Sequence, residues 1–320
     1  MEIVSKEVQA EVDVIVVGGG AAGLSAATAL ARSLRSVVVV DGGEPRNAPS
    51  SHAHNVFTRD GAAPAELLRL AREEADHYGV TVIPGRASTA SREEGGTLTV
   101  DLAGGDRLRG RRLLLATGLS DELPDVPGVR ELWGKDVLHC PYCHGWEVRG
   151  QRIGVLGTGP GSAHQALMFR QLSPDVTFFQ HDAPALSEVQ AEQLRARGIR
   201  VVANRVVALA MSEGRLQGIE LDGGDQVPLD VVTVSPRFTA RAEIFSALGG
   251  VVEKHPAGVG TYVPTDPAGR TAVDGVWAAG NVTDLAAMVA ASAGAGVSVA
   301  AAINSDLVLE DVRRAVALAV

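Results

Sequence analysis

The two cysteines of the 320-residue chain, Cys140 and Cys143, are separated by only two residues. Thiols at this spacing close into a disulfide within one turn of chain, and a thiolate there is stabilised if the turn opens a helix. Such a pair performs two-electron thiol–disulfide exchange. The spacing therefore favours a redox-active pair.

Three other uses of this pair stay open from spacing alone. A structural zinc site would combine both thiols with a flanking histidine, but such sites usually bring a second ligand pair, and none is evident. A structural disulfide across two residues restrains little chain in a protein long enough to bury a core. Glutaredoxins share the Pro-Tyr dipeptide, but they are short domains with the motif near the start. We expect no metal here.

The composition fits an ordinary globular protein of about two domains, with 46% hydrophobic and 21% charged residues. The formal net charge is −9 with both signs mixed along the chain, so no nucleic-acid partner is expected. A single thiol pair and a charged start without a signal-peptide core predict a cytoplasmic protein. Residues 285–303 carry no charge and are long enough to cross a bilayer, but alanine, glycine and serine dominate them. We expect a buried helix there and no membrane partner.

A nucleotide-binding pattern precedes the cysteines in the chain. An apolar strand over residues 12–17 runs into a turn in which Gly18, Gly20 and Gly23 stand at the dinucleotide fingerprint spacing. Glycines there let a pyrophosphate approach backbone N–H groups at a helix N-terminus. Asp41 ends the next strand, 18 residues beyond Gly23, where a carboxylate accepts hydrogen bonds from an adenosine ribose.

The same pattern recurs after the cysteines. A strand at 153–156, a glycine turn at 157–162, a helix at 163–172 and a strand at 176–179 indicate a duplicated nucleotide fold. Other expected elements are helices at 64–78 and 187–197, antiparallel meanders at 81–109 and 206–227, and strands at 113–118, 199–202, 231–234 and 275–279. We predict an α/β protein with two Rossmann-like, three-layer nucleotide-binding domains, the second inserted in the first. Residues 1–121 and 245–320 form the discontinuous first domain, and residues 122–244 form the inserted domain with the thiol pair.

This arrangement resembles the low-molecular-weight thioredoxin reductases, which are flavoproteins, over essentially the whole chain. The resemblance rests on the first glycine turn, on Ala116-Thr117-Gly118, on the thiol pair, and on Ala279-Gly280-Asn281 before a glycine-containing terminal helix. It implies FAD in the first domain and a homodimer. The residues that it assigns to FAD are Gly18, Gly20, Gly23, Asp41, Asn47, Asn55, Thr117, Gly118, Gly280, Asn281 and Met288.

Two departures from the reductases bear on the direction of electron flow. Reductases that use NADPH grip its 2′-phosphate with arginines, but residues 179–185 contain no arginine or lysine, and Asp182 would repel a phosphate. Pro160 and Gly161 also alter the second glycine turn. The second departure is His144, which stands where these reductases place an aspartate.

The string Cys140-Pro-Tyr-Cys143-His144-Gly-Trp-Glu is similar to that of dithiol oxidases of the gliotoxin and holomycin type. In those flavoenzymes a small dithiol reduces the flavin through the enzyme's disulfide, and dioxygen reoxidises it. The resemblance assigns Cys140 as the interchange thiol and Cys143 as the thiol facing the flavin. We assign His144 as acid and base, because an imidazole exchanges protons near neutral pH.

The expected activity is therefore an FAD-dependent dithiol oxidase that closes an intramolecular disulfide in a natural-product dithiol and reduces dioxygen to peroxide. We expect it to serve antibiotic biosynthesis. An NAD(P)H-dependent reductase of thioredoxin or another disulfide is the alternative, and a flavin-binding redox sensor also remains open. The identity of the dithiol, the use of NADH and the choice between biosynthesis and self-protection stay open. So do the roles of His52, His54, His139 and Trp146.

Overall fold

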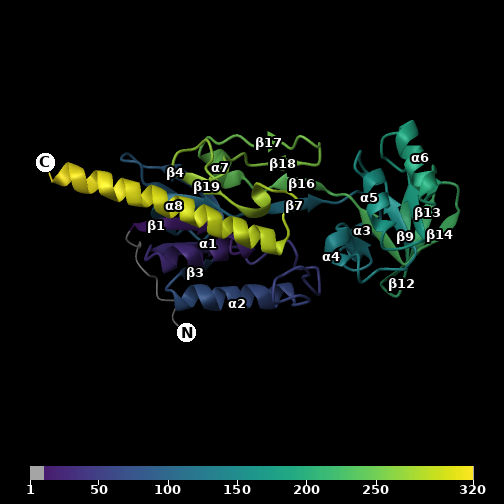
Figure 1. The fold of residues 1–320 in the computed structure, drawn as a ribbon, viewed down its shortest axis with the longest axis horizontal. Coiled ribbons are helices and arrows are strands. Elements are labelled where there is room, and N and C mark those ends of the chain that lie inside the picture. Colours follow the sequence, from purple (N-terminus) through teal and green to yellow (C-terminus); the bar gives the residue numbers. More distant parts are fainter. Residues whose placement is uncertain (1–10, 320) are drawn as a thin grey trace. The chain divides into compact units, whose positions relative to one another are not determined.

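The computed structural model describes residues 11–319, which divide into two compact units (Figure 1). The first unit holds the described residues up to Ala48, together with Asn55–Ser120 and the residues from Phe238 onward. The second unit holds Pro49–His54 and Asp121–Arg237. The second unit is thus an insertion into the first, and it also takes a short segment that the sequence analysis had left in the first domain. Part of the charged start, residues 1–10, lies outside the described residues.

The first unit is built on a sheet that has seven strands among the described residues, in the order β3-β2-β1-β6-β5-β4, with β19 also paired to β6. These strands are β1 (Val12–Val17), β2 (Val37–Asp41), β3 (Thr81–Pro84), β4 (Ala87–Arg92), β5 (Leu98–Leu102), β6 (Arg107–Leu115) and β19 (Val276–Ala278). Strands β3, β2, β1, β6 and β19 are parallel, and β5 and β4 continue the sheet antiparallel.

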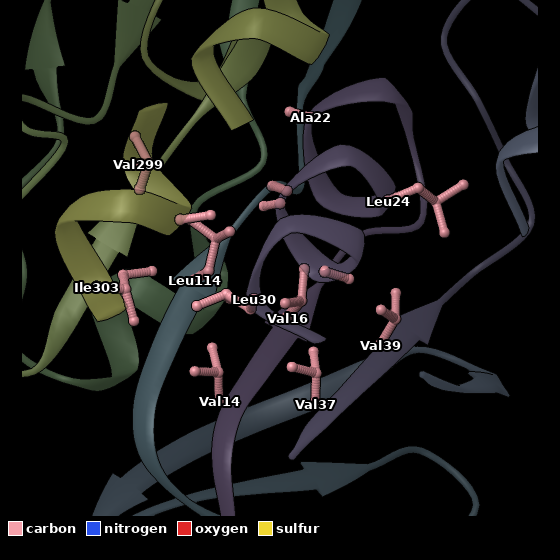
Figure 2. Packing of buried hydrophobic residues seen from close by; sticks show 14 of the residues in the cluster. Val14, Val16, Ala22, Leu24, Leu30, Val37, Val39, Leu114, Val299 and Ile303 are labelled. Atoms are coloured by element: carbon pink, nitrogen blue, oxygen red, sulfur yellow. The ribbon is translucent and has the colours of Figure 1, made fainter. Parts of the chain in front are cut away.

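Both faces of the central strands are buried, which explains their continuous apolar runs. Val14 and Val16 of β1 point to one face and pack against Leu30 of α1 (Ala21–Arg32), as Figure 2 shows. Ile15 and Val17 point to the other face, where Phe245 of α7 (Glu243–Ala247) belongs to the same cluster. This burial fixes the register of the strands, because a slip of one residue would exchange the two faces.

The face that carries α1 is also covered by α2 (Pro64–His77) and by the long α8 (Val289–Leu318). Helix α8 crosses α1 closely, because a Cβ on Gly296 would collide with the carbonyl oxygen of Ala22. The helix that we expected to be buried is buried on one face only. Its length and a mean hydropathy of 1.3 would be sufficient for a membrane span. The apolar residues that stay exposed on α8 are Val297, Val308, Leu309, Val312, Val316 and Leu318.

The second unit repeats the α/β plan with a parallel sheet in the order β11-β10-β9-β15-β8. An antiparallel sheet, β12-β13-β14, packs against it through a shared cluster that includes Phe179 and Ile219. The strands are β8 (Val137–Leu138), β9 (Ile153–Leu156), β10 (Val176–Phe179), β11 (Arg200–Val202), β12 (Val206–Ser212), β13 (Arg215–Leu221), β14 (Gln226–Pro228) and β15 (Val231–Val234). The helices are α3 (Val129–Leu132), α4 (Pro141–His144), α5 (Ser162–Phe169) and α6 (Glu188–Ala196).

The remaining described elements are short. They are β7 (Leu119–Glu122), β16 (Arg237–Ala240), β17 (Glu253–Lys254), β18 (Thr261–Tyr262) and the 3₁₀ turn η1 (Gly280–Val282). Strands β7 and β16 pair with each other, and β17 pairs with β18.

The first meander departs from the sequence prediction at both ends. Strand β3 joins the parallel sheet beside β2 instead of the meander. Strand β6 is one nine-residue strand that covers both the last meander strand and the separate strand predicted at 113–118. Its first part, up to Gly110, pairs antiparallel with β5, and its residues from Gly110 to Leu115 pair parallel with β1. The charged stretch Arg107–Arg112 hid this continuity, because its alternation resembles that of an exposed hairpin.

Candidate active site

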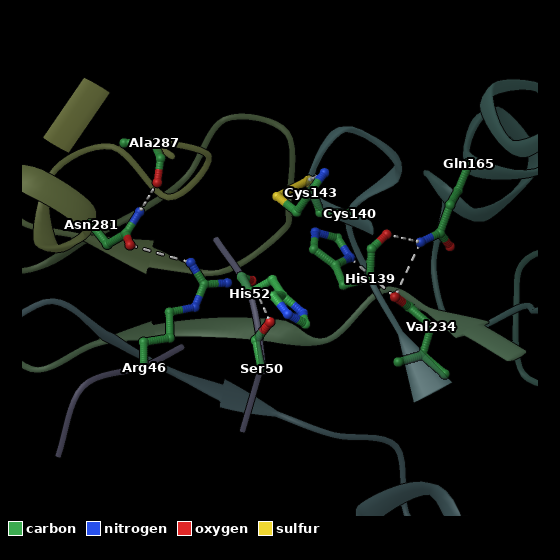
Figure 3. The surroundings of a disulfide bond; sticks show 10 residues. All are labelled: Arg46, Ser50, His52, His139, Cys140, Cys143, Gln165, Val234, Asn281 and Ala287. Carbon is green, nitrogen blue, oxygen red and sulfur yellow. Dashed lines mark hydrogen bonds between the residues drawn. A yellow bond between two sulfur atoms is a disulfide. The ribbon is translucent and has the colours of Figure 1, made fainter. Parts of the chain in front are cut away.

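The thiol pair lies at the carboxyl end of β8, an edge strand of the second sheet. Cys140 caps α4, and its Sγ accepts a hydrogen bond of 3.2 Å from the backbone N–H of Cys143. Pro141 occupies the first helical position, where its fixed φ is already suited to a helix. Cys140 and Cys143 form a disulfide with their Cα atoms 5.2 Å apart (Figure 3).

A buried glutamine fixes the start of this turn. The Nε2 atom of Gln165, a residue only 3% exposed, donates to the carbonyl oxygens of His139 at 2.9 Å and Val234 at 3.1 Å (Figure 3). Its Oε1 accepts a hydrogen bond from Ser235 Oγ at 3.0 Å. The Nδ1 atom of His139 lies 3.0 Å from the same Val234 carbonyl, which can only accept, so Nδ1 carries the proton and the Nε2 of a neutral ring is basic.

The end of the turn is fixed by Gly145. A Cβ at this position would collide with the carbonyl oxygen of Pro141 and the side chain of Leu172. The residue after His144 must therefore be small for α4 to pack against the region that follows α5. Two large side chains around the thiols stay exposed to solvent, Tyr142 at 70% and Trp146 at 68%.

His144 is partly buried directly after Cys143. Burial lowers the pKa of His144 below its usual value, the carboxylate of Glu147 raises it in part, and the positive charge of His54 lowers it. The direction of this shift keeps the imidazole neutral at pH 7, so the ring is available as a proton acceptor beside the disulfide.

The segment 49–54 carries His52 and His54, whose roles the sequence left open. Pro49 packs on Gly134 of the second unit, where a Cβ would stand 2.8 Å from the Cβ of Pro49. His54 then reaches Glu147, with His54 Nε2 3.4 Å from Glu147 Oε1. The segment separates β2 from α2, two elements of the other unit, and nothing in its residue pattern indicates the unit to which it binds. Among residues 11–319, no group of three or more histidine, cysteine or carboxylate side chains is arranged to hold a metal ion.

The first glycine turn is shaped to accept a phosphate group. Gly18 has φ +114, and a Cβ there would collide with the carbonyl of Ala116, while a Cβ on Gly23 would collide with that of Gly18. Gly20 begins α1 without any side-chain cap, and space around its Cβ position is open. The N-terminal donors of α1 are therefore left for a ligand.

Asp41 lies beside this turn, since a Cβ on Gly19 would touch its carboxylate. Its side chain is 15% exposed, accepts a hydrogen bond of 3.0 Å from the backbone of Gly43 and pairs with Arg72 at 2.7 Å. Gly280, with φ +79, approaches the start of α1, where its Cβ would stand 2.8 Å from that of Ala22. The carboxyl ends of β1, β2 and β19 thus bring three of the sequence-predicted segments together.

Other predicted cofactor residues lie around the same end of the sheet or in nearby loops. Thr117 Oγ1 donates to the carbonyl of Arg241 at 2.5 Å, and Gly118 has φ +71. Asn281 uses Nδ2 for the carbonyls of Asp284 and Ala287 and accepts from Arg46 at 3.4 Å (Figure 3). Its amide therefore stabilises the loop before α8. Three predicted residues remain. Met288 is the N-cap of α8, and Asn47 lies in a turn after β2. Asn55 has φ +60, and its backbone N–H donates to Asp60 Oδ1.

Comparison with known proteins agrees with this architecture. The pyridine nucleotide-disulphide oxidoreductase family matches residues 12–302. The chain belongs to this family. It is 35% identical over 280 residues, or 84% of the chain and 86% of the relative, to thioredoxin reductase tcpT of Claviceps purpurea. It is 32% identical to thioredoxin reductase aclD of Aspergillus oryzae, over 84% of this chain and 88% of the relative.

Solved structures give the same result. The crystal structure of HlmI matches with a TM-score of 0.91 and 47% identity over 97% of this chain and 96% of that one. An oxidoreductase from Agrobacterium tumefaciens matches with a TM-score of 0.88 and 35% identity over 94% and 99% of the two chains. The resemblance to thioredoxin reductase-like flavoproteins and the α/β nucleotide-binding fold are therefore confirmed, and FAD is the cofactor. The open first glycine turn fits that cofactor.

Proposed function

We propose that this oxidoreductase is a dithiol oxidase, which closes an intramolecular disulfide in a small-molecule dithiol with dioxygen as the final acceptor. The observation that carries this choice is that Ser162 already satisfies two backbone N–H groups of the second glycine turn, where a nicotinamide nucleotide would bind. The alternative, a reductase driven by NAD(P)H, needs that turn to be open.

Ser162 is the first residue of α5, directly after the second turn. This residue is fully buried, and its Oγ accepts hydrogen bonds from the backbone N–H groups of Thr158 at 3.1 Å and Gly159 at 3.2 Å. These N–H groups are the donors that a pyrophosphate would need. A nucleotide would have to displace a satisfied, buried hydroxyl to reach them.

The ribose side of the second turn is also occupied. The loop after β10 folds back so that Asp182 N–H donates to the carbonyl of Gly157 at 3.1 Å. The side chain of His181 is 3% exposed, accepts from the backbone N–H of Val206 at 3.3 Å and lies 3.2 Å from Asp182. Arg205 lies outside the stretch 179–185 but is near it in the structure. Its guanidinium is 3.9 Å from the carboxylate of Asp182 and so already has a partner. This arrangement disfavours a 2′-phosphate.

The residues of the thiol site support disulfide exchange. A substrate thiol gives its proton to the neutral imidazole of His144, and the resulting thiolate attacks Cys140 Sγ. The Cys140–Cys143 bond breaks, a mixed disulfide forms, and Cys143 leaves as a thiolate. The second substrate thiol loses its proton to solvent, and its thiolate attacks the substrate sulfur of the mixed disulfide, so that the ring closes and Cys140 is released as a thiolate. The substrate has lost two electrons, and the enzyme pair has gained them.

FAD, when bound, would supply the remaining redox chemistry, as acceptor of the two electrons of the thiol pair and their donor to dioxygen, which would give hydrogen peroxide. Cys140 and Cys143 would then be back in the disulfide seen here. The protein's own contribution is to hold the pair in a turn fixed by Gln165 and Gly145.

The setting of the enzyme is also a proposal. The similarity to tcpT, aclD and HlmI supports a natural-product dithiol as substrate and a role in antibiotic biosynthesis. A cytoplasmic homodimer fits the single thiol pair and the exposed apolar residues along α8. Light scattering of the purified protein would show one species of twice the chain mass if this proposal holds.

Anaerobic mixing tests the proposed function. The FAD-loaded protein is mixed separately with a small dithiol, NADPH and NADH while the flavin absorbance is recorded. We expect the dithiol alone to bleach the flavin, and air to restore the colour with one peroxide formed per dithiol oxidised. Rapid bleaching by NADPH or NADH would instead establish the reductase alternative, and slow bleaching by every dithiol would favour a sensor.

A further inference from the structure

A histidine–carboxylate pair lies next to the thiol site and has no part in the exchange steps described above. His54 Nε2 stands 3.4 Å from Glu147 Oε1, and the side chains are 22% and 42% exposed. Glu147 follows His144 by three residues in the same turn of chain. The two partners therefore join the segment 49–54 to the turn that carries the proposed base.

The segment that supplies His54 is held in place along its length. Pro49 is in close contact with Gly134, and Ser50 Oγ donates to the carbonyl of His52 at 2.7 Å. Ala53, the neighbour of His54, is 7% exposed. These contacts reduce the freedom of His54, so its imidazole meets Glu147 at little further cost in conformational entropy.

We propose that His54 and Glu147 are a positioning pair that joins the segment 49–54 to the thiol turn and sets the charge around the His144 imidazole. This inference rests on the proposed function, because it concerns the same exchange site. When the substrate S–H bond breaks, the proton passes to the His144 imidazole, and the Glu147 carboxylate stabilises the imidazolium. The electrostatic effect of His54 opposes that stabilisation and favours return of the proton from His144 to solvent.

The charged groups that act on His144 come from two elements. Glu147 lies on its own turn and raises the pKa of His144, while His54 from the segment 49–54 lowers it, and burial lowers it most. His52 lies beside His54 with 6.3 Å between ring centroids, and His139 is engaged with the Val234 carbonyl. Removal of the two members of the pair should therefore shift His144 in opposite directions.

Substitution of each member tests this inference. Glu147→Gln removes the carboxylate that raises the pKa of His144, so this pKa should fall; His54→Gln removes the residue that lowers it, so the pKa should rise. Titration of ¹³C-labelled histidine rings in the FAD-loaded protein measures this directly, with the His144 signal assigned by its loss in His144→Gln. Glu147→Asp keeps the charge and should shift the pKa less than Glu147→Gln.

The rate of anaerobic flavin reduction by a dithiol gives a second readout. This rate should fall as the pH drops through the pKa of His144, because the protonated ring cannot accept a thiol proton. The acid limb should thus move to lower pH in Glu147→Gln and to higher pH in His54→Gln. Two exposed residues of the same unit provide matched controls, Glu131→Gln and His164→Gln, which should leave both readouts unchanged.

Two outcomes overturn the inference. One is an unchanged His144 titration in both variants, and the other is a shift in the same direction in both, which a general loosening of the turn would produce. The proposed function fails separately: if the wild-type protein oxidises no dithiol while the two titrations still move in opposite directions, the pair stands and the activity assignment is wrong.

Discussion

The two glycine turns of this protein share one architecture but differ in what satisfies their backbone donors. In the first unit, Gly20 begins α1 without a side-chain cap, and no atom lies within 4 Å of its Cβ position. In the second unit, Ser162 accepts two of the corresponding N–H groups. Both turns follow a buried parallel strand, so the strand–turn–helix pattern alone does not determine nucleotide binding. Function depends on whether a side chain of the protein already satisfies the donors.

This difference implies a division of labour between the units. The first unit keeps the site that fits FAD, while the second unit carries the thiol pair and a glycine turn in which Ser162 satisfies two backbone donors. Electrons would then enter through the thiols of the second unit instead of through a nicotinamide.

The largest expected effect separates thiol chemistry from flavin binding. Cys140→Ser and Cys143→Ser should each lower dithiol oxidation by ~10³-fold or more, because neither exchange step proceeds with a single sulfur. FAD should remain bound, since the thiols lie in the unit that does not carry the first glycine turn. Stopped-flow flavin reduction by the dithiol and the ratio of flavin to protein absorbance measure the two effects. Substantial turnover by either variant would contradict the exchange mechanism.

The next prediction tests the glycine turns against each other. Gly18→Ala places a Cβ against the Ala116 carbonyl at φ +114, a conformation that costs a non-glycine residue about 1–3 kcal/mol before any collision. We expect the purified variant to lose most of its FAD and therefore its activity. The matched change Gly159→Ala meets no atom within 4 Å and should leave FAD content and turnover unchanged.

Flavin absorbance after desalting measures retention, and circular dichroism checks that both variants are folded. Full FAD retention by Gly18→Ala would show that the first turn is not the pyrophosphate site. Loss of FAD in Gly159→Ala would indicate that the cofactor binds at the second glycine turn and not at the first.

Local patterns explain why much of the fold was predictable. The run of residues 12–17 and the recurrence at 153–156 predict buried strands because both are continuously apolar, and each is followed by a glycine turn and a helix. In the first turn, Gly18 has a φ that only glycine adopts easily. The sequence predicted two strands where the structure has the single strand β6. Its arginines alternate as in an exposed hairpin, whereas its continuity comes from pairing with β5 on one side and β1 on the other. The start of α8 was expected near residue 285, but Asn281 holds the chain in a loop until Met288.

The thiol site was predicted only in its contiguous part. Cys140, Cys143 and His144 are adjacent in sequence, so their spacing already indicated their chemistry. The contact of His54 with Glu147 joins residues that are 93 positions apart, and it depends on how Pro49 packs on Gly134. The capping role of Ser162 was likewise not predicted, because a serine in a glycine turn is compatible with either an open or a closed site. Such contacts depend on tertiary packing, which the local periodicity of apolar residues does not predict.

The smallest expected effect sharpens the comparison at Ser162 itself. Ser162→Ala leaves the N–H groups of Thr158 and Gly159 without their buried acceptor, which should cost about 1–3 kcal/mol of unfolding free energy. Dithiol turnover should stay within about twofold of wild type, because the thiol turn is held by Gln165 and Gly145. NADPH should still fail to reduce the flavin, since His181 and Asp182 continue to fill the ribose side. Urea unfolding and anaerobic nucleotide mixing measure these outcomes. Rapid reduction of the flavin by NADPH in Ser162→Ala would mean that this one hydroxyl separates an oxidase from a reductase.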